Sequence, residues 1–468
     1  MSRTEAQLSS GSAGSPNSGG RKPGARLLAL GWPLVISFWL RQAFSWIDRI
    51  YAASLDGQVD AAQAAISLAV PLEFLMIALW VGSSNALTSL LSEAMGAGDD
   101  ERVEDLLRTM RRIVLALGVS FLGLATCIWF FYDRFGLDAQ VASAFRVYAT
   151  VLIGGSAFTA FWSILPDSLV KAHQDTKTTM WAGIASSVVN VALNTVFVFV
   201  FHWGLFGIGL STALGRLAGF FYAQYRAAAH EHGRRAASRA PSVGRRWAPA
   251  LGALLAIAIP SSLTYVLMAT EGFLINGILA SGADSKARLA GFGIFDSTLR
   301  FLAMPPIAIG VALLPLAGRL RGEGRLDELS AEVRAGVGWV LGYSLLFVAP
   351  LGLLFAGSLA DALLSEPAAR EHARLGMRWL VPGVFSVGLV FFLRPLFDAL
   401  GAATRGLLMS AIRSLGFIVP GGFLGERLAQ ALGLAPAEGF YSGLVLGMLA
   451  GAVAFGLAAR GKLNSASG

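Results

Sequence analysis

The sequence 27-LLALGWPLVISFWLRQAFSWIDRIYA-52 decides the class of fold, because it is long, mostly apolar and carries few charges. A helix that crosses a bilayer needs about 20 such residues. Similar runs recur along the 468-residue chain, which is 55% hydrophobic and only 14% charged, with a mean hydropathy of +0.62. A soluble protein carries about a quarter charged residues, and a disordered chain needs low hydrophobicity. A membrane β-barrel would alternate apolar and polar residues. We therefore predict an all-α polytopic membrane protein.

The apolar runs predict twelve transmembrane helices. Residues 1–25 are rich in Ser, Gly and Pro and lack a signal-peptide pattern, so we predict a disordered cytoplasmic tail. We further predict an N-terminal six-helix lobe at 26–229, a basic cytoplasmic linker at 230–248, a C-terminal six-helix lobe at 249–460 and a cytoplasmic tail at 461–468. The spans are expected at about 27–52, 63–91, 112–132, 143–170, 178–201, 204–229, 249–280, 289–317, 334–360, 375–401, 406–425 and 437–459.

The basic residues indicate the orientation. Of the 37 Lys and Arg residues, 23 fall in segments on the side that holds both termini and eight on the other side. Cytoplasmic loops are enriched in Lys and Arg. We therefore predict cytoplasmic termini in an inner (plasma) membrane of the bacterial type. The net charge of +8 then reflects topology, and we expect no nucleic-acid partner.

The two halves of the chain resemble each other. The first span contains LALGWPLVISF and the seventh LAIAIPSSLTY, in which Pro33 and Pro260 are 227 residues apart. The second and eighth spans are followed by GAGDDERVEDLLR and GEGRLDELSAEVR, and Pro166 and Pro395 mark the fourth and tenth. Each half has an even number of spans, so the repeats are parallel. Two such lobes can rock about a central cavity, which predicts a transporter.

Twelve ionisable side chains fall inside the predicted spans, where each costs at least about 3 kcal/mol unless it has a partner or a function. Two acid–base pairs are spaced i,i+4 and are possible gates: Asp296 with Arg300, and Arg394 with Asp398. Asp48 lies on one helix face with Arg41 and Ser45. It is the strongest candidate for a proton or cation site, because a carboxylate removed from water takes up a proton more readily.

The order of these motifs resembles the multidrug and toxic compound extrusion (MATE) family, part of a larger group that includes oligosaccharide-lipid flippases. The resemblance rests on WPLVISFWLRQAFSWIDRIYAA, the small residues before GAGD, KAHQDTKTTM, SSVVNVALNTVFVF and LRPLFDALGAATRG. It implies a secondary transporter that exchanges an organic solute for protons or sodium and contains no bound cofactor.

The resemblance also implies roles for individual residues. It makes Asp48 the acid that binds the coupling ion, with Asn190 and Asn194 as the polar pair beside it. Many family members have an acid where this chain has Asn194, and the loss of one carboxylate favours a proton over sodium. A second acidic site is possible at Glu271, in a helix where some members place a functional Glu, or at Glu73.

Two functions stay open from the sequence. The first is an antiporter that exports small organic compounds, drug-like or metabolite. The second is a flippase or transporter for an anionic or phosphate-bearing, lipid-linked solute, because the guanidinium groups of Arg41, Arg216 and Arg413 suit phosphate if they face the cavity with Ser45. An enzyme, a metal site and a nucleotide partner are not expected, since the five histidines are scattered and no P-loop is present. We expect a monomer whose partners are the solute and membrane lipid.

Overall fold

The computed structural model describes residues 23–44, 47–55, 59–135, 138–237, 247–281 and 284–467, and within these ranges all the regular structure is helical. The first half of the chain forms eight α-helices with a short 3₁₀ turn and a π turn. They are α1 (Ala25–Phe44), α2 (Ile47–Ala52), α3 (Val59–Ala97), α4 (Asp100–Phe131), η1 (Tyr132–Phe135), α5 (Ala139–Trp162), α6 (Ile164–Ala172), α7 (Thr176–Thr195), η2 (Val196–Val200) and α8 (Gly204–Ala237).

The second half continues the pattern with nine α-helices and two π turns. They are α9 (Trp247–Ala280), α10 (Ser285–Gly322), α11 (Leu326–Tyr343), η3 (Ser344–Val348), α12 (Ala349–Leu363), α13 (Pro367–Arg378), α14 (Leu380–Ala399), α15 (Ala403–Ala411), η4 (Ile412–Ile418), α16 (Val419–Ala431) and α17 (Pro436–Ser467).

Eleven helical stretches in the described part of the chain are long and apolar enough to cross a membrane, and Ala25–Leu40 is a shorter apolar helix in the position of the predicted first span. Several stretches combine two elements. The predicted fourth span is divided at Ser163 into α5 and α6, and the tenth at Trp379 into α13 and α14. The all-helical membrane fold predicted from the sequence is therefore confirmed, with spans that are less continuous than the hydropathy suggests.

Several helices are longer than the spans predicted for them, and two extend well into predicted polar segments. α17 continues through Ser467, and α8 continues to Ala237, well past residue 229. Arg234 in the last turn of α8 holds this extension against α4, because its guanidinium bonds Asp100 at 2.5 Å and Glu104 at 2.8 Å. Basic residues in a last turn also suit the negative end of the helix dipole.

The helix ends confirm the internal repeat. Gly98, after α3, and Gly324, after α10, have φ of 70° and 72°. Gln174, after α6, and Gly401, after α14, match in the same way, with φ of 62° and 65°. In all four cases the amide of the next residue bonds the carbonyl five residues before it, at 2.7–2.9 Å. This left-handed cap ends a helix by satisfying a free carbonyl, and it recurs at equivalent points of both halves.

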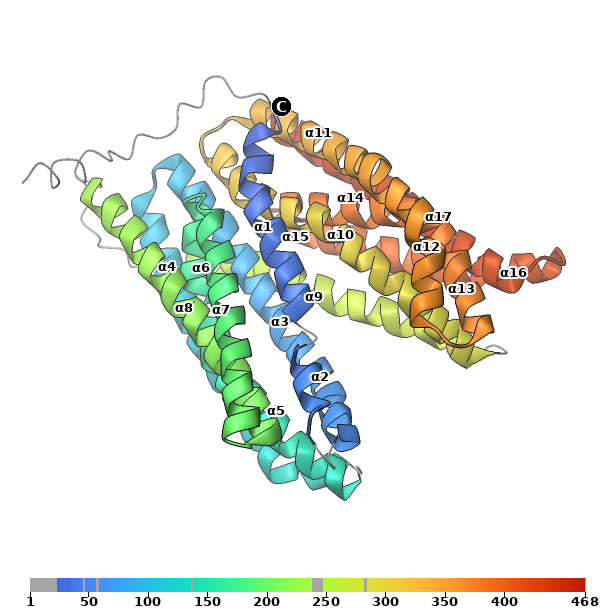
Figure 1. Ribbon diagram of the computed structural model, residues 1–468. Coiled ribbons are helices and arrows are strands. Elements are labelled where there is room, and N and C mark those ends of the chain that lie inside the picture. Colours follow the sequence, from blue (N-terminus) through green and yellow to red (C-terminus); the bar gives the residue numbers. More distant parts are fainter. Residues whose placement is uncertain are drawn as a thin grey trace, which may run out of the picture.

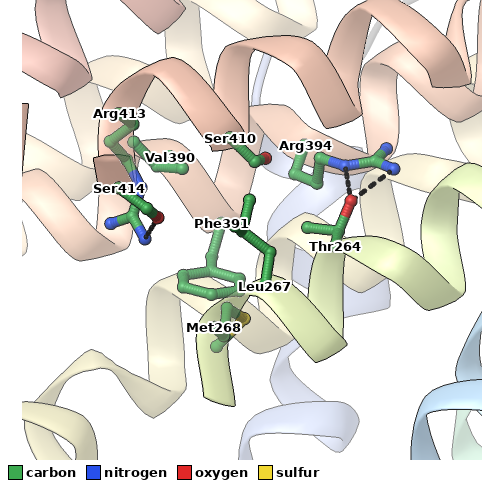
Figure 2. A pocket seen from close by; sticks show the side chains of 9 residues that line it. All are labelled: Thr264, Leu267, Met268, Val390, Phe391, Arg394, Ser410, Arg413 and Ser414. Atoms are coloured by element: carbon green, nitrogen blue, oxygen red, sulfur yellow. Dashed lines mark hydrogen bonds between the residues drawn. The ribbon is translucent and has the colours of Figure 1, made fainter. Parts of the chain in front are cut away.

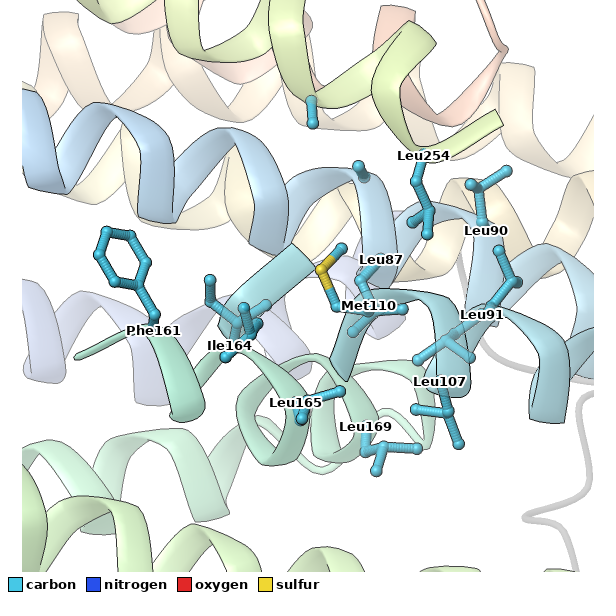
Figure 3. Close-up of a cluster of buried hydrophobic side chains, with 14 of the residues drawn as sticks. Leu87, Leu90, Leu91, Leu107, Met110, Phe161, Ile164, Leu165, Leu169 and Leu254 are labelled. Carbon is cyan, nitrogen blue, oxygen red and sulfur yellow. The ribbon is translucent and has the colours of Figure 1, made fainter. Parts of the chain in front are cut away.

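The helices form two bundles that diverge from the end of the molecule where the C-terminus lies (Figure 1). α4–α8 belong to one bundle and α10–α17 to the other, and the contacts of α3 with α9 and α10 join them. The first helix of each half enters the core of the other half. In α9, Leu254 packs among Leu87, Leu91 and other residues of the first half (Figure 3). In α1, Leu34 packs against residues of α10 such as Leu313.

Candidate functional site

The carboxylate of Asp48 lies at the centre of a polar cluster in the first half. α2 carries Asp48, and three other helices supply donors to it. The hydroxyl of Thr212 (α8) donates to Oδ2 at 3.0 Å, the amide of Asn194 (α7) donates to Oδ1 at 3.3 Å, and the hydroxyl of Tyr148 (α5) reaches Oδ2 at 3.5 Å. Among the side chains that the structure describes, no basic group lies within ion-pairing distance of Asp48.

The two predicted asparagines belong to this cluster. Asn190 donates to the hydroxyl oxygen of Thr212 at 3.0 Å, and its own oxygen accepts from Asn194 at 3.4 Å. Asn194 is fully buried, and its Oδ1 has no hydrogen-bond partner among the described residues. The structure therefore brings Asp48, Asn190 and Asn194 together, as the i,i+4 spacing on α7 and the position of Asp48 predict.

An ion pair lies beside Asp48. The guanidinium of Arg216 (α8) binds the carboxylate of Glu73 (α3) through Nη2 and donates from Nη1 to the buried hydroxyl of Ser156 (α5) at 2.6 Å. Arg216 follows Thr212 by four residues, so the two side chains lie on one face of α8. The charges of Glu73 and Arg216 both act on Asp48. Glu73, predicted as a possible second acidic site, thus neighbours the first.

The second half holds a separate small pocket beside an ion pair (Figure 2). Arg413 lies in the π turn η4, which turns its side chain towards Glu271 of α9, and the two bond at 2.8 Å. The hydroxyl of Ser414 donates to the same Glu271 oxygen. The pocket beside this ion pair is lined by Thr264, Leu267, Met268, Val390, Phe391, Arg394, Ser410, Arg413 and Ser414.

Both predicted i,i+4 pairs form. Arg300 bonds Asp296 at 2.7 Å in a partly exposed pair. Arg394 bonds Asp398 at 2.5 Å in a pair that is almost completely buried. Asp398 also accepts from Ser261 of α9 at 2.7 Å and from Asn85 of α3 at 3.4 Å. This second pair therefore connects the two halves of the molecule.

The arginines proposed as ligands for an anionic cargo have acidic partners. Arg216 pairs with Glu73 and Arg413 with Glu271, in each case on another helix. Ser45 and the side chain of Arg41 lie outside the part of the molecule that the structure describes. Sequence reasoning missed Thr212, Tyr148 and Ser156, which complete the cluster. The i,i+4 spacing of Thr212 and Arg216 within an apolar span was the signal that could have identified Thr212.

Two segments of the chain, residues 33–196 and 260–424, match the MatE family. The chain belongs to the MatE family. Its two matching segments correspond to the two halves of the internal repeat, and each covers most of one half. The family consists of transporters, not enzymes, so this chain is an integral membrane transporter.

Two curated relatives come from the bacterium Bacillus subtilis. The chain is 24% identical over 285 residues to the probable multidrug resistance protein YoeA of Bacillus subtilis, covering 60% of each protein. It is 23% identical over 393 residues to the probable multidrug resistance protein YpnP of the same organism, covering 83% of this chain and 85% of the relative. The chain thus spans less than two thirds of the first relative and most of the second.

Solved structures share the fold over nearly the whole chain. The MATE transporter VcmN of Vibrio cholerae in its bent form superposes with a TM-score of 0.82 at 22% identity, covering 95% of this chain and 97% of that one. An outward-facing multidrug resistance MATE family transporter of the MOP superfamily gives a TM-score of 0.83 at 19% identity, with the same coverage. These likenesses establish the MATE fold of this chain.

Proposed function

We propose that this transporter is an antiporter that exports small organic compounds in exchange for protons, with Asp48 as the group that carries the proton. The observation that supports this proposal most strongly is the environment of Asp48. Its oxygens face three O–H or N–H donors and, among the described side chains, no cation. Removal from water favours the neutral acid. Sodium prefers several oxygen ligands, whereas a proton needs one titratable group, and Asn194 supplies no second charge.

Gradient-driven transport in vesicles tests this function. The purified protein is reconstituted with ethidium, a fluorescent organic cation, and either a pH gradient or a sodium gradient is imposed. We expect the pH gradient alone to drive ethidium transport by the wild type, and Asp48→Asn to abolish it. Asp361→Asn, which removes an acid from an exposed pair with Arg374 in the other half, serves as the matched control and should retain transport. Full transport by Asp48→Asn would refute the proton-carrying role.

We propose that transport proceeds by rocking of the two lobes, with Arg394–Asp398 as a gate. Asp398 accepts from Asn85 through its side chain, and its backbone carbonyl accepts from Ser89 at 3.2 Å. Both donors lie on α3, in the first half. Opening of the molecule at this point would have to break these bonds, so the pair would hold the lobes together until they separate.

The alternative function, transport of an anionic or phosphate-bearing solute, has less support. It requires guanidinium groups free to bind phosphate. The two arginines proposed for this role whose side chains are described, Arg216 and Arg413, are each neutralised by a glutamate. We therefore favour export of a neutral or cationic solute.

We also propose a monomer in the inner membrane with both termini in the cytoplasm. The bias of Lys and Arg towards one side supports this orientation. A cysteine introduced at Ser465 in a Cys127→Ser background tests it. A membrane-impermeant maleimide should label this cysteine only after the cells are permeabilised. Labelling of intact cells would reverse the proposed orientation.

A further inference from the structure

Two carboxylates and one guanidinium share the polar cluster of the first half. Asp48 and Glu73 both interact with Arg216, which in this structure binds Glu73. The three groups sum to one negative charge when both acids are ionised. They sum to zero when Asp48 is protonated. They also sum to zero when both acids are ionised and a solute cation is bound. The empty, fully ionised state is therefore the only one of the three with uncompensated charge inside the membrane, which is costly.

The Glu73–Arg216 pair is built differently from the buried pairs of this protein. Its side chains are 29% and 25% exposed, whereas those of Asp398 and Arg394 are 0% and 8% exposed. A partly exposed carboxylate can be reached by a solute, and its partner has room to move. Arg394 is fixed by Thr264 and Ser261 in addition to its acid. Arg216 has Ser156 besides Glu73.

The geometry allows Arg216 to turn towards Asp48. Side chains on a helix lean towards its N-terminus, and the residue one turn before Arg216 on that face is Thr212, which bonds Asp48 at 3.0 Å. The bond from Arg216 Nη1 to Ser156 can act as the pivot, while Nη2 exchanges one carboxylate for the other. Thr212 thus places Asp48 at the same face of α8 from which Arg216 projects.

A buried oxygen without a hydrogen-bond partner gives independent support for a rearrangement of hydrogen bonds in this cluster. Oδ1 of Asn194 is buried and lacks a hydrogen-bond partner among the described residues, although Nδ2 of the same amide donates to Asp48. A buried acceptor without a partner costs free energy. A donor that arrives during the transport cycle, either a protonated Asp48 or the guanidinium of Arg216, would satisfy it.

We propose that Arg216 is a movable cation that masks Glu73, and that Glu73 is a conditional binding site for a cationic solute; this inference rests on the proposed antiport. When Asp48 is protonated, Arg216 stays on Glu73 and the solute site is closed. When Asp48 releases its proton to the aqueous side, Arg216 turns towards the new carboxylate. Glu73 is then left with an unpaired negative charge, which binds the cation. Reprotonation of Asp48 returns Arg216 to Glu73 and expels the solute.

Among the described side chains, no other charged group near Asp48 replaces Arg216 in this scheme. Among the elements packed against α2, α3 contributes Glu73, α8 contributes Arg216 and α7 contributes the neutral Asn190 and Asn194. Tyr148 approaches from α5. α1 also contacts α2, and the side chain of its Arg41 lies outside the described part of the molecule. Arg49 follows Asp48 on the same helix, about 100° around the axis. Arg216 is the described cation whose charge acts on Asp48, and it contacts Glu73 and Ser156.

Binding of tetraphenylphosphonium, a cation that cannot titrate, tests the proposal. Binding to the purified protein is measured in mildly alkaline and mildly acidic buffer. We expect the wild type to bind at least about fivefold more tightly in alkaline buffer, the lower range of typical site-to-site coupling. Asp48→Asn, which mimics the protonated acid, should bind weakly in both. Arg216→Gln, which unmasks Glu73 and keeps a polar side chain at this position, should bind tightly in both.

The double variant E73Q/R216Q isolates the carboxylate without leaving Arg216 unpaired. It should bind at least about fivefold more weakly than Arg216→Gln, although the two proteins differ only at Glu73. Asp361→Asn, which removes the acid of the exposed Arg374–Asp361 pair in the other half, is the matched control and should bind as the wild type does. Size-exclusion chromatography and thermal unfolding confirm that each variant is folded.

Three results would overturn the inference. First, E73Q/R216Q and Arg216→Gln bind tetraphenylphosphonium equally tightly. Second, binding by Arg216→Gln depends on pH as binding by the wild type does. Third, the wild type does not bind tetraphenylphosphonium in alkaline buffer. Failure of this inference can be distinguished from failure of the proposed antiport. If the wild type transports ethidium on a pH gradient but Glu73 makes no difference to cation binding, only the inference fails. If the pH gradient drives no transport, the antiport itself fails.

Discussion

Replacement of Asp398 by Asn should destabilise the protein strongly. The side chain is fully buried and accepts from Arg394 at 2.5 Å, Ser261 at 2.7 Å and Asn85 at 3.4 Å. Asn has nearly the same volume, so packing is kept and the charge alone is lost. Removal of one partner from a buried ion pair costs about 3–5 kcal/mol, because the other charge is left uncompensated. We expect about 3 kcal/mol, since Thr264 still accepts from Arg394 at 3.2 Å.

Unfolding by SDS in detergent micelles, followed by tryptophan fluorescence, measures this free energy. The variant Arg394→Met should cost a similar amount. The double variant R394M/D398N should cost less than the sum of the two, by at least about 1 kcal/mol, because neither charge then remains. Asp296→Asn breaks a pair with the same i,i+4 spacing whose side chains are 31% and 51% exposed, so its cost should stay below about 1 kcal/mol. Equal, small costs for Asp398→Asn and Asp296→Asn would refute the argument from burial.

Three further predictions concern stability. Gly98→Ala and Gly324→Ala should each cost about 1–2 kcal/mol, because these residues have φ of 70° and 72° with open space around them, and the loss should be seen in thermal unfolding. Gly82→Val should lower the melting temperature far more than Gly123→Val, because a Cβ at Gly82 meets Ser262 of α9 whereas Gly123 faces open space. Burial raises the pKa of Asp175, but hydrogen bonds from Thr178, His230 and Arg226 outweigh it and hold that pKa below its usual range. The stabilisation by Asp175 is thus complete above the usual pKa of about 3.9 and is lost as the pH falls below it, so melting of Asp175→Asn should depend less on acid than melting of the wild type.

The sequence predicts the membrane fold well because the bilayer imposes length and hydropathy on each span. It also predicts Asp296–Arg300 and Arg394–Asp398, whose partners are one turn apart on one helix. Contacts between helices are harder to predict. Glu73 and Arg216 are 143 residues apart, and only the packing of α3 against the rest of the bundle shows that they meet. The π turn at Arg413 is equally hard to predict. No local residue pattern indicates that the helix takes up an extra residue at this turn, which directs the Arg413 side chain towards Glu271.

In the candidate site, too, contacts within one helix are easier to predict than contacts between helices. Asp48, Asn190 and Asn194 are suggested by a buried acid and by i,i+4 spacing, and the structure brings them together. Thr212 lies one turn before Arg216 in an apolar span, which is a weak local signal, whereas nothing local distinguishes Tyr148 from a packing residue. Their contact with Asp48 depends on the crossing of α5 and α8 at one point of the bundle.

The most direct test of the central claim is a count of protons released when a solute binds. Tetraphenylphosphonium, which carries no proton of its own, is added to the purified wild type in weakly buffered solution with a pH indicator. If Asp48 exchanges its proton for the solute, the wild type should release a proton on binding, and Asp48→Asn should release none. Release of the same quantity of protons by Asp48→Asn would contradict the account, because another group would then carry the exchanged proton.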